Sequence, residues 1–270
     1  MRLWVVAALV VTLVGCAAPP TGSQWVHDNG LAAVIDDADT ETVAAPGASA
    51  FVRVPRPATP PGPRRIGLQA GHWRTAEVPA ELKRLETLTG TSGGGVSEWE
   101  LNLDIANRVA AVLRERGYAV DVLPATIPPG YLAEAFVSLH ADGSTDPGAR
   151  GFKAAHSSRR GPYEDALLAS LIAEYAITTR LPQDDAITSG MRNYYAFNWR
   201  RYQSTVAPHT PAVILEMGFL TSPADRAVLV GRSALVADAI VRGIVRFLEA
   251  VPAGAAFAED IVVPARGGVR

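Results

Sequence analysis

The sequence has few of the residues that mark several common classes of protein. A single cysteine among 270 residues excludes an intramolecular disulfide framework, and it excludes a zinc ribbon or an iron–sulfur cluster held by several thiolates. Lysine and arginine number 25 against 27 aspartates and glutamates, so the chain lacks the basic excess of a dedicated nucleic-acid binder, and we expect no nucleic-acid partner. Any bound metal is therefore expected on histidine and carboxylate side chains.

The chain also has only a short hydrophobic run, near its N-terminus. Met1 and Arg2 precede twelve uncharged residues, 3–14, a length typical of a signal peptide and too short for a transmembrane span. The run ends in Val14-Gly15-Cys16, which resembles the bacterial lipobox, in which the cysteine carries lipid and becomes the new N-terminus. We therefore expect a lipoprotein signal peptide over residues 1–15 and lipid on Cys16. The alternative is a plain signal peptide with a structural cysteine.

The rest of the chain divides by composition. Residues 16–64 lack core periodicity and are rich in proline and glycine, which favours a stiff, extended stalk. Residues 65–250 have the size and pattern of one compact domain, and residues 251–270 are expected to be a flexible tail. The protein would then be tethered by its lipid to a bacterial membrane, outside the cytoplasm, in the periplasm or cell envelope.

Apolar runs and helix signals alternate within residues 65–250. Ser97 and Glu100 form a capping box ahead of an apolar stripe, and Ser222-Pro223 is typical of a helix start. The alternation predicts an α/β domain with a mainly parallel sheet covered by helices on both faces. Strands are expected at 66–70, 118–123, 136–140, 151–155 and 212–216, and helices at 97–116, 163–180, 234–248 and, as a short turn, after 222.

Several titratable residues lie where the predicted strands end. His72 follows the strand at 66–70, His140 ends the next central strand, and Glu216 ends the strand at 212–216, while Glu98 opens the capped helix. Functional sites of such sheets form at the carboxyl ends of the strands, so these residues are expected to meet. Two histidines and one glutamate are a known catalytic zinc set, and a further carboxylate can take the proton of water. The four residues would supply three ligands and one general base.

Each of these residues also has a purely structural explanation. His72 fits a solvated loop, His140 fits a satisfied core histidine, and Glu98 is favoured by the helix dipole alone. Glu216 is the strongest single signal, because an unpaired acid at the end of an apolar strand is costly to bury. No local metal motif such as HExxH is present. The residues by themselves predict a metallo-hydrolase without deciding which of the four holds the metal.

Four segments in this order resemble the zinc-dependent N-acetylmuramoyl-L-alanine amidases, and more narrowly the amidase-3 type. The resemblance covers nearly all of residues 65–248 and implies a single α/β domain around a mostly parallel six-stranded sheet. The segments are IGLQAGH at 66–72, EWELNLDIA at 98–106, FVSLHA at 136–141 and PAVILEMGF at 211–219.

The resemblance also implies a site and a reaction. One zinc ion per chain would be held by His72, Glu98 and His140, with Glu216 as the catalytic acid and base. The reaction implied is hydrolysis of the amide between N-acetylmuramic acid and L-alanine of the stem peptide, so peptidoglycan is the expected substrate. An activator protein is a further partner to consider, and we expect a monomer.

The sequence departs from the family pattern after the first histidine. The family has a glycine-rich, aspartate-containing turn there, whereas this chain continues Trp-Arg-Thr-Ala-Glu, so details of substrate recognition stay open. A polar-aromatic stretch at 188–197 supplies Arg192, Asn193 and Tyr194 as candidate substrate contacts, with a packed loop as the alternative. Two other functions remain: a zinc peptidase or other amidohydrolase on this scaffold, and a non-catalytic peptidoglycan-binding lipoprotein.

Overall fold

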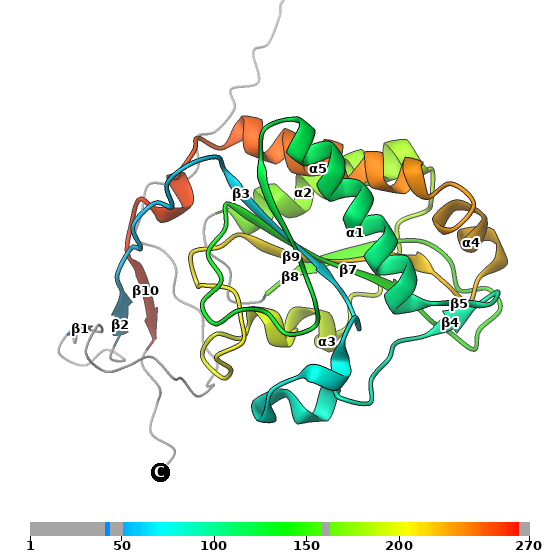
Figure 1. Ribbon diagram of the computed structural model, residues 1–270, viewed down its shortest axis with the longest axis horizontal. Coiled ribbons are helices and arrows are strands. Elements are labelled where there is room, and N and C mark those ends of the chain that lie inside the picture. The colour runs from blue at the N-terminus through cyan, green and yellow to red at the C-terminus, as the bar shows by residue number, and fades with distance from the viewer. Residues whose placement is uncertain (1–40, 44–50, 158–162, 265–270) are drawn as a thin grey trace, which may run out of the picture.

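A five-stranded sheet is the centre of the fold. The computed structural model describes residues 41–43, 51–157 and 163–264 (Figure 1). The strand order is β6-β3-β7-β9-β8, in which β6, β3, β7 and β9 run parallel and β8 runs antiparallel to β9. The strands are β3 (Arg65–Ala70), β6 (Ala119–Leu123), β7 (Ala135–Asp142), β8 (Lys153–His156) and β9 (Ala212–Phe219). The expected signal peptide and Cys16 lie outside the described residues.

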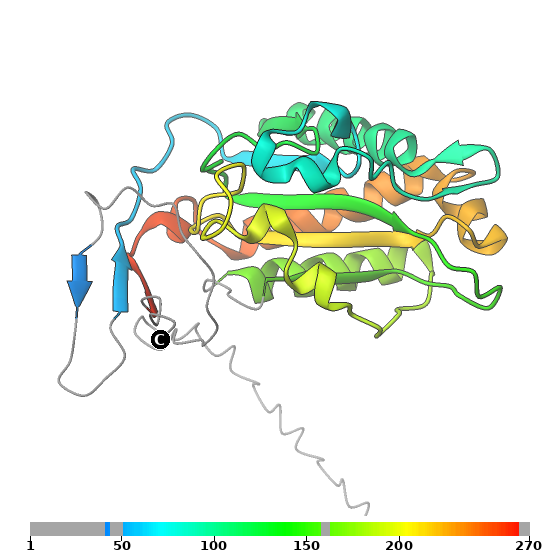
Figure 2. The same cartoon turned by 90° about the horizontal axis from the view of Figure 1, so that it is seen from below.

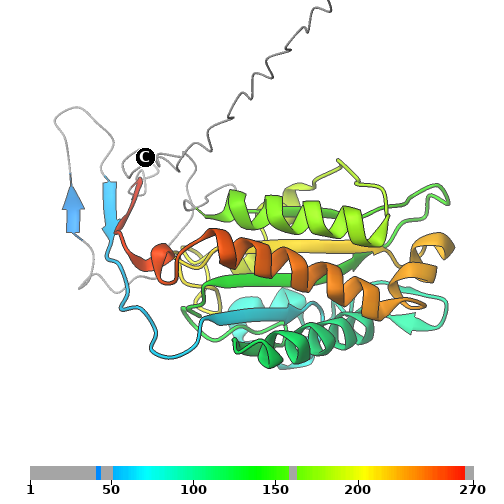
Figure 3. The same ribbon diagram turned by 90° about the horizontal axis from the view of Figure 1, so that it is seen from above.

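Three long helices cover one face of this sheet, as Figure 3 shows from above: α1 (Glu98–Glu115), α2 (Glu164–Thr179) and α5 (Ser233–Ala250). Their apolar sides and the facing strand residues form the larger core cluster. The capping box predicted before α1 is present, with the Ser97 amide donating to Glu100 Oε2 at 3.1 Å. The short helix α4 (Pro223–Leu229) begins as predicted, with Ser222 at its N-cap and Pro223 in its first turn.

Short helical segments cover the opposite face, visible in Figure 2. They are η2 (Thr75–Glu77), η3 (Ala80–Leu85), α3 (Ser189–Arg192) and η4 (Tyr195–Phe197). Together with aromatic side chains of the sheet they form a second buried cluster. The prediction of an α/β domain with a mostly parallel, covered sheet is therefore confirmed, although one of its two covers is made of short helical segments and loops.

The expected count of six strands is wrong. Next to the edge strand β8, the described chain makes only an isolated bridge between Phe152 and Gln183. Pro182 precedes that bridge and has no N–H with which to extend a ladder. A sixth strand is therefore absent from this sheet among the described residues.

A second, three-stranded sheet joins segments from both ends of the chain. Its order is β1-β2-β10, made of β1 (Glu41–Val43), β2 (Phe51–Val54) and β10 (Ile261–Pro264), and both pairings are antiparallel. The short helix η5 (Ala255–Phe257) leads into β10. The structure thus differs from the expected loose tail, because β10 finds its hydrogen-bond partner in β2, within the stretch expected to be a stalk.

Glu134 contacts the segments that enter and leave the main domain. Its carboxylate is 2.7 Å from the Arg64 guanidinium and accepts a hydrogen bond from the amide of Gly254 at 3.2 Å. Arg64 also donates to the carbonyl of Leu248. None of the helices in the described ranges is long and apolar enough to cross a membrane.

Candidate active site

Strand register places the candidate residues in one row at the carboxyl ends of the strands. His140 of β7 pairs with Glu216 of β9, and Glu216 pairs with Lys153 of β8. Paired residues of neighbouring strands point to the same face of a sheet, so these three side chains share the face covered by the short helices. The parallel sheet therefore brings together residues that are 76 positions apart in sequence.

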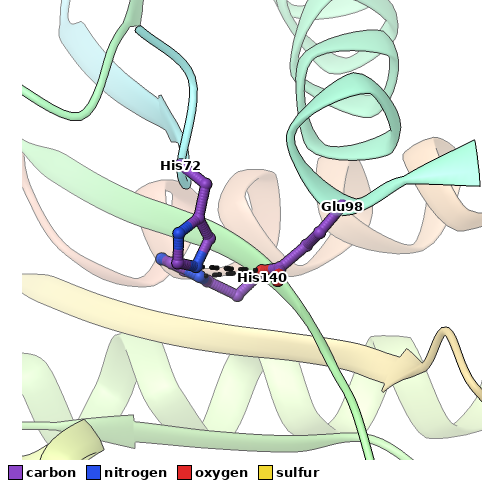
Figure 4. A group of neighbouring side chains, drawn as sticks. All are labelled: His72, Glu98 and His140. Carbon is purple, nitrogen blue, oxygen red and sulfur yellow. Dashed lines mark hydrogen bonds and ion pairs between the residues drawn. The ribbon is translucent and has the colours of Figure 1, made fainter. Parts of the chain in front are cut away.

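His72, Glu98 and His140 converge on one point (Figure 4). Glu98 Oε1 lies 3.4 Å from His72 Nε2 and 3.1 Å from His140 Nδ1, and the three possible ligand atoms all lie within 4.8 Å of one another. Zinc binds nitrogen and oxygen ligands at about 2.1 Å in a tetrahedron, which separates neighbouring ligand atoms by about 3.4 Å. The two short separations already match that spacing.

The outward-facing nitrogen of each imidazole has its own hydrogen-bond partner. His72 Nδ1 lies 2.6 Å from the carbonyl oxygen of Leu88, and His140 Nε2 lies 2.9 Å from the Tyr194 hydroxyl. Histidines that bind metal almost always donate the N–H of their other nitrogen to such an oxygen. Each ring is thus hydrogen-bonded on its outer side while its inner nitrogen faces Glu98.

The backbone around the cluster is shaped to admit these side chains. A Cβ added to Gly71 would lie 2.3 Å from the His140 ring, and one added to Gly90 would lie 2.4 Å from Glu98 Oε2. His72 itself is in the left-handed region, with φ at 62°. A non-glycine residue held there costs about 1 kcal/mol or more, and such strain gathers at functional sites.

Mutual interaction shifts the pKa values of these three groups. Burial alone would raise the pKa of Glu98, but the hydrogen bond that a protonated His140 ring donates and the charges of both histidines lower it to about 2. Burial lowers the pKa of His72. Burial would also lower the pKa of His140, yet its hydrogen bond to Glu98 and the charge of Glu216 raise it. Glu98 is therefore an anion, available as a ligand, across the physiological pH range.

Glu216 lies next to this cluster in a different electrostatic environment. Burial raises its pKa to about 8, and the charges of Asp142 and Glu98 add to the rise, while His140 and Lys153 oppose it. A carboxyl group with such a pKa can hold or release a proton near neutral pH. The site thus contains two glutamates whose surroundings push their pKa values apart, a pattern typical of divided acid–base and ligand roles.

Lys153 is a charged residue of the site that the sequence did not indicate. Its ammonium lies 2.6 Å from Asp142 Oδ2 and 2.9 Å from Asp184 Oδ2, and its side chain is 7% exposed. It also lies 5.1 Å from the centre of the Phe219 ring. The register partner of Glu216 is therefore a lysine that two aspartates already hold in place.

The three candidate substrate contacts differ in their exposure and in their hydrogen bonds. Tyr194 is partly buried and contacts His140 through its hydroxyl, whereas Arg192 and Asn193 are exposed, at the end of α3 and just after it. The Asn193 amide donates to the Ser189 carbonyl at 2.9 Å. A substrate contact by any of them stays a prediction. Sequence reasoning also missed Gln69 and Ser138, which are fully buried polar residues next to Tyr194.

Comparison with known proteins gives one family and several similar folds. A sequence profile of the amidase-3 family, described as N-acetylmuramoyl-L-alanine amidase, matches residues 66–246. A search of the curated proteins finds no significant match.

Among solved structures, the N-acetylmuramyl-L-alanine amidase Ami1 from Mycobacterium smegmatis is 21% identical, with a TM-score of 0.52 over 70% of this chain and 99% of that one. The N-acetylmuramoyl-L-alanine amidase from Clostridium difficile 630 is 16% identical, with a TM-score of 0.51 over 71% and 100% of the two chains. The apo form of Ami1 from Mycobacterium abscessus is 19% identical, with a TM-score of 0.50 over 70% and 100%. At these identities the structural likeness establishes the fold alone.

Proposed function

The chain belongs to the N-acetylmuramoyl-L-alanine amidase family, a family of peptidoglycan hydrolases, and on that premise we propose that it cleaves its amide with one zinc ion held by His72, Glu98 and His140. The observation that carries the proposal is the convergence of three ligand atoms within 4.8 Å, each imidazole being hydrogen-bonded on its outer nitrogen. Two neutral imidazoles and one carboxylate suit zinc and leave a fourth position open. When bound, zinc supplies Lewis acidity that polarises the amide carbonyl and lowers the pKa of water.

In this proposal, Glu216 moves the proton of the reaction. Its carboxyl group lies in the same row as His140 and has a pKa of about 8, so it can accept a proton from the attacking water and return it to the leaving nitrogen. The amide nitrogen leaves as the free amine of L-alanine. Glu98 cannot serve as the base, because its pKa of about 2 makes it a weak one and its Oε1 faces both histidines.

The test is a digestion of purified peptidoglycan combined with metal analysis. We expect about one zinc per chain, and release of intact stem peptides that carry a free N-terminal L-alanine, abolished by a chelator. Peptides cut internally would instead indicate a zinc peptidase, and zinc-free protein that only binds peptidoglycan would indicate a non-catalytic role. Zinc-loaded protein that becomes active only with a second protein would indicate an activator.

Two variants separate the ligand and proton-transfer roles. Glu216→Gln keeps the shape of the side chain and removes its ability to exchange a proton, so it should retain zinc and lose hydrolysis. His140→Ala should lose both zinc and hydrolysis. Zinc retention at one equivalent in His140→Ala would contradict the ligand set, and activity in Glu216→Gln would contradict the proton-transfer role.

We also propose that lipid on Cys16 tethers the protein to a bacterial membrane on the extracytoplasmic side, where peptidoglycan is found. The uncharged run at 3–14 that ends in Gly15-Cys16 supports this. Expression with a labelled fatty acid should label the full chain, and the label should disappear in Cys16→Ala. Light scattering on the soluble protein lacking residues 1–16 should give the mass of a monomer.

A further inference from the structure

A chain of buried and partly buried hydrogen bonds leads from His140 into the protein, away from the proposed metal. Tyr194 lies 2.9 Å from His140 Nε2 and donates its hydroxyl proton to Gln69 Oε1 at 3.0 Å. Ser138 donates to the same oxygen of Gln69 at 2.7 Å. Gln69 and Ser138 are fully buried, on the adjacent strands β3 and β7. None of these residues is among the proposed ligands, and the proposed proton transfer does not use them.

The far end of this chain fixes the orientation of the Gln69 amide. Gln69 Nε2 lies 3.1 Å from the carbonyl oxygen of Ala125 and 3.3 Å from that of Pro124, and carbonyl oxygens can only accept. The same nitrogen donates to the Tyr195 hydroxyl at 2.8 Å, and that hydroxyl donates in turn to Ala125. The Gln69 amide therefore has one orientation, with its oxygen toward Tyr194 and Ser138.

This orientation determines the tautomer of His140. Because the Tyr194 proton is directed to Gln69 Oε1, the Tyr194 oxygen is left to accept, and its partner His140 Nε2 must carry a hydrogen. The reverse arrangement would leave the oxygens of Tyr194 and Gln69 only 3.0 Å apart with no hydrogen between them. A protonated Nε2 leaves the lone pair of the neutral ring on Nδ1, 3.1 Å from Glu98 Oε1, and the proposed metal ion would be the partner of both atoms.

We propose that Tyr194 is a positioning residue that, through Gln69, holds His140 in the tautomer whose Nδ1 binds the metal. This inference rests on the proposed zinc site and deepens it. Tyr194 was a candidate substrate contact in the sequence, whereas here its hydroxyl acts on a ligand. Removing such an outer hydrogen bond commonly costs ten- to a hundredfold in metal affinity.

The test measures the affinity for zinc and the protonation of each His140 ring nitrogen, without reference to hydrolysis. In zinc-loaded wild-type protein, long-range ¹H–¹⁵N spectra should show His140 bound through Nδ1 and protonated at Nε2, its signals being identified by their loss in His140→Gln. Competition with a chelating dye should show at least tenfold weaker zinc binding in Tyr194→Phe. The matched control is Tyr131→Phe. It removes a partly buried hydroxyl that donates to Asp121 at 2.8 Å, and Tyr131 belongs to the same aromatic cluster as Tyr194 without a hydrogen bond to His140. Its zinc affinity should be unchanged.

The outcomes separate this inference from the proposed function. Zinc bound to wild-type His140 through Nε2 overturns it without any variant, so the test stands even if Tyr194→Phe fails to fold. Zinc bound equally tightly through Nδ1 in Tyr194→Phe overturns it while leaving the zinc site intact. Wild-type protein that takes up no zinc overturns the proposed function and this inference together.

Discussion

Replacing Glu216 with glutamine in the metal-free protein should stabilise the fold, and increasingly so as the pH rises. The ordinary pKa of a glutamate is 4.5, whereas burial raises that of Glu216 to about 8 in the folded chain. Between these two values the unfolded chain releases the proton and the folded chain keeps it. The unfolded state therefore binds fewer protons, and the free energy of unfolding falls as the pH rises through this window.

The expected size follows from the width of the window. One pKa unit corresponds to about 1.4 kcal/mol, so raising the pH from 5.5 to 7.5 should cost the wild-type protein about 3 kcal/mol through Glu216 alone. Glutamine does not titrate and loses nothing. The charge of Glu216 raises the pKa of His140, so the comparison of the two proteins includes this coupling, while Glu98, with its pKa of about 2, is already ionised in both.

The assay is urea unfolding of both proteins in a chelator at several pH values from 5.5 to 8. The quantity of interest is the difference between their free energies of unfolding, which should grow in favour of Glu216→Gln by about 3 kcal/mol up to pH 7.5. It should shrink again when zinc is added, because a nearby cation favours the ionised carboxylate. A difference that stays constant across the range would refute the raised pKa and, with it, the reason for assigning proton transfer to Glu216.

Three further substitutions test other parts of the structure. Gly71→Ala places a Cβ 2.3 Å from the His140 ring and should weaken zinc binding at least tenfold in a competition assay, whereas Gly190→Ala, whose nearest neighbour is 3.6 Å away, should not. Asp225→Ala removes the acceptor of two buried backbone N–H groups and should lower the free energy of unfolding by about 3 kcal/mol, while Asp225→Asn, which keeps an acceptor oxygen, should lower it less. Arg180→Gly should raise the free energy of unfolding by about 1 kcal/mol in urea, because Arg180 is the C-cap of α2 with φ at 61°, where glycine is not strained. An unchanged free energy of unfolding would contradict this strain.

The main sheet and the cluster of His72, Glu98 and His140 could be predicted from the sequence because both depend on local signals. The strand that precedes His72 and the strands that contain His140 and Glu216 are apolar runs, and Ser97 with Glu100 marks the helix that begins at Glu98. Once the strands are parallel and adjacent, their ends meet at one edge, so the cluster follows from the fold class. The convergence of His72, Glu98 and His140 was therefore predictable, although their roles as ligands stay a proposal.

The residues around the cluster could not be found in this way. Gln69 and Ser138 look like ordinary interruptions of apolar strands, and their meaning appears only when Tyr194, more than 50 residues later, lies over both. Lys153 reads as the exposed side of an edge strand, yet Asp142 and Asp184 bury it. Such contacts are set by tertiary packing between distant loops, for which no periodicity exists in sequence.

The second sheet was missed for a related reason. β10 has no partner nearby in the chain, because it pairs with β2, and β2 is followed by a proline-rich stretch that indicates an extended segment. Pairing across about 200 residues leaves no local trace. The expectation of a stalk and a tail thus described the composition correctly but not the hydrogen bonds that those segments form with each other.

The second sheet lies at the end of the molecule opposite to the candidate site residues. In Figure 3 the parallel strands of the main sheet point away from β2 and β10, so the chain enters the folded domain at the end opposite to His72, His140 and Glu216. Glu134 braces this entry point through Arg64 and Gly254. With lipid on Cys16 as the proposed anchor, the chain would approach the domain at the end opposite to the proposed catalytic residues. The proposed catalytic residues would then face away from the membrane, toward the peptidoglycan.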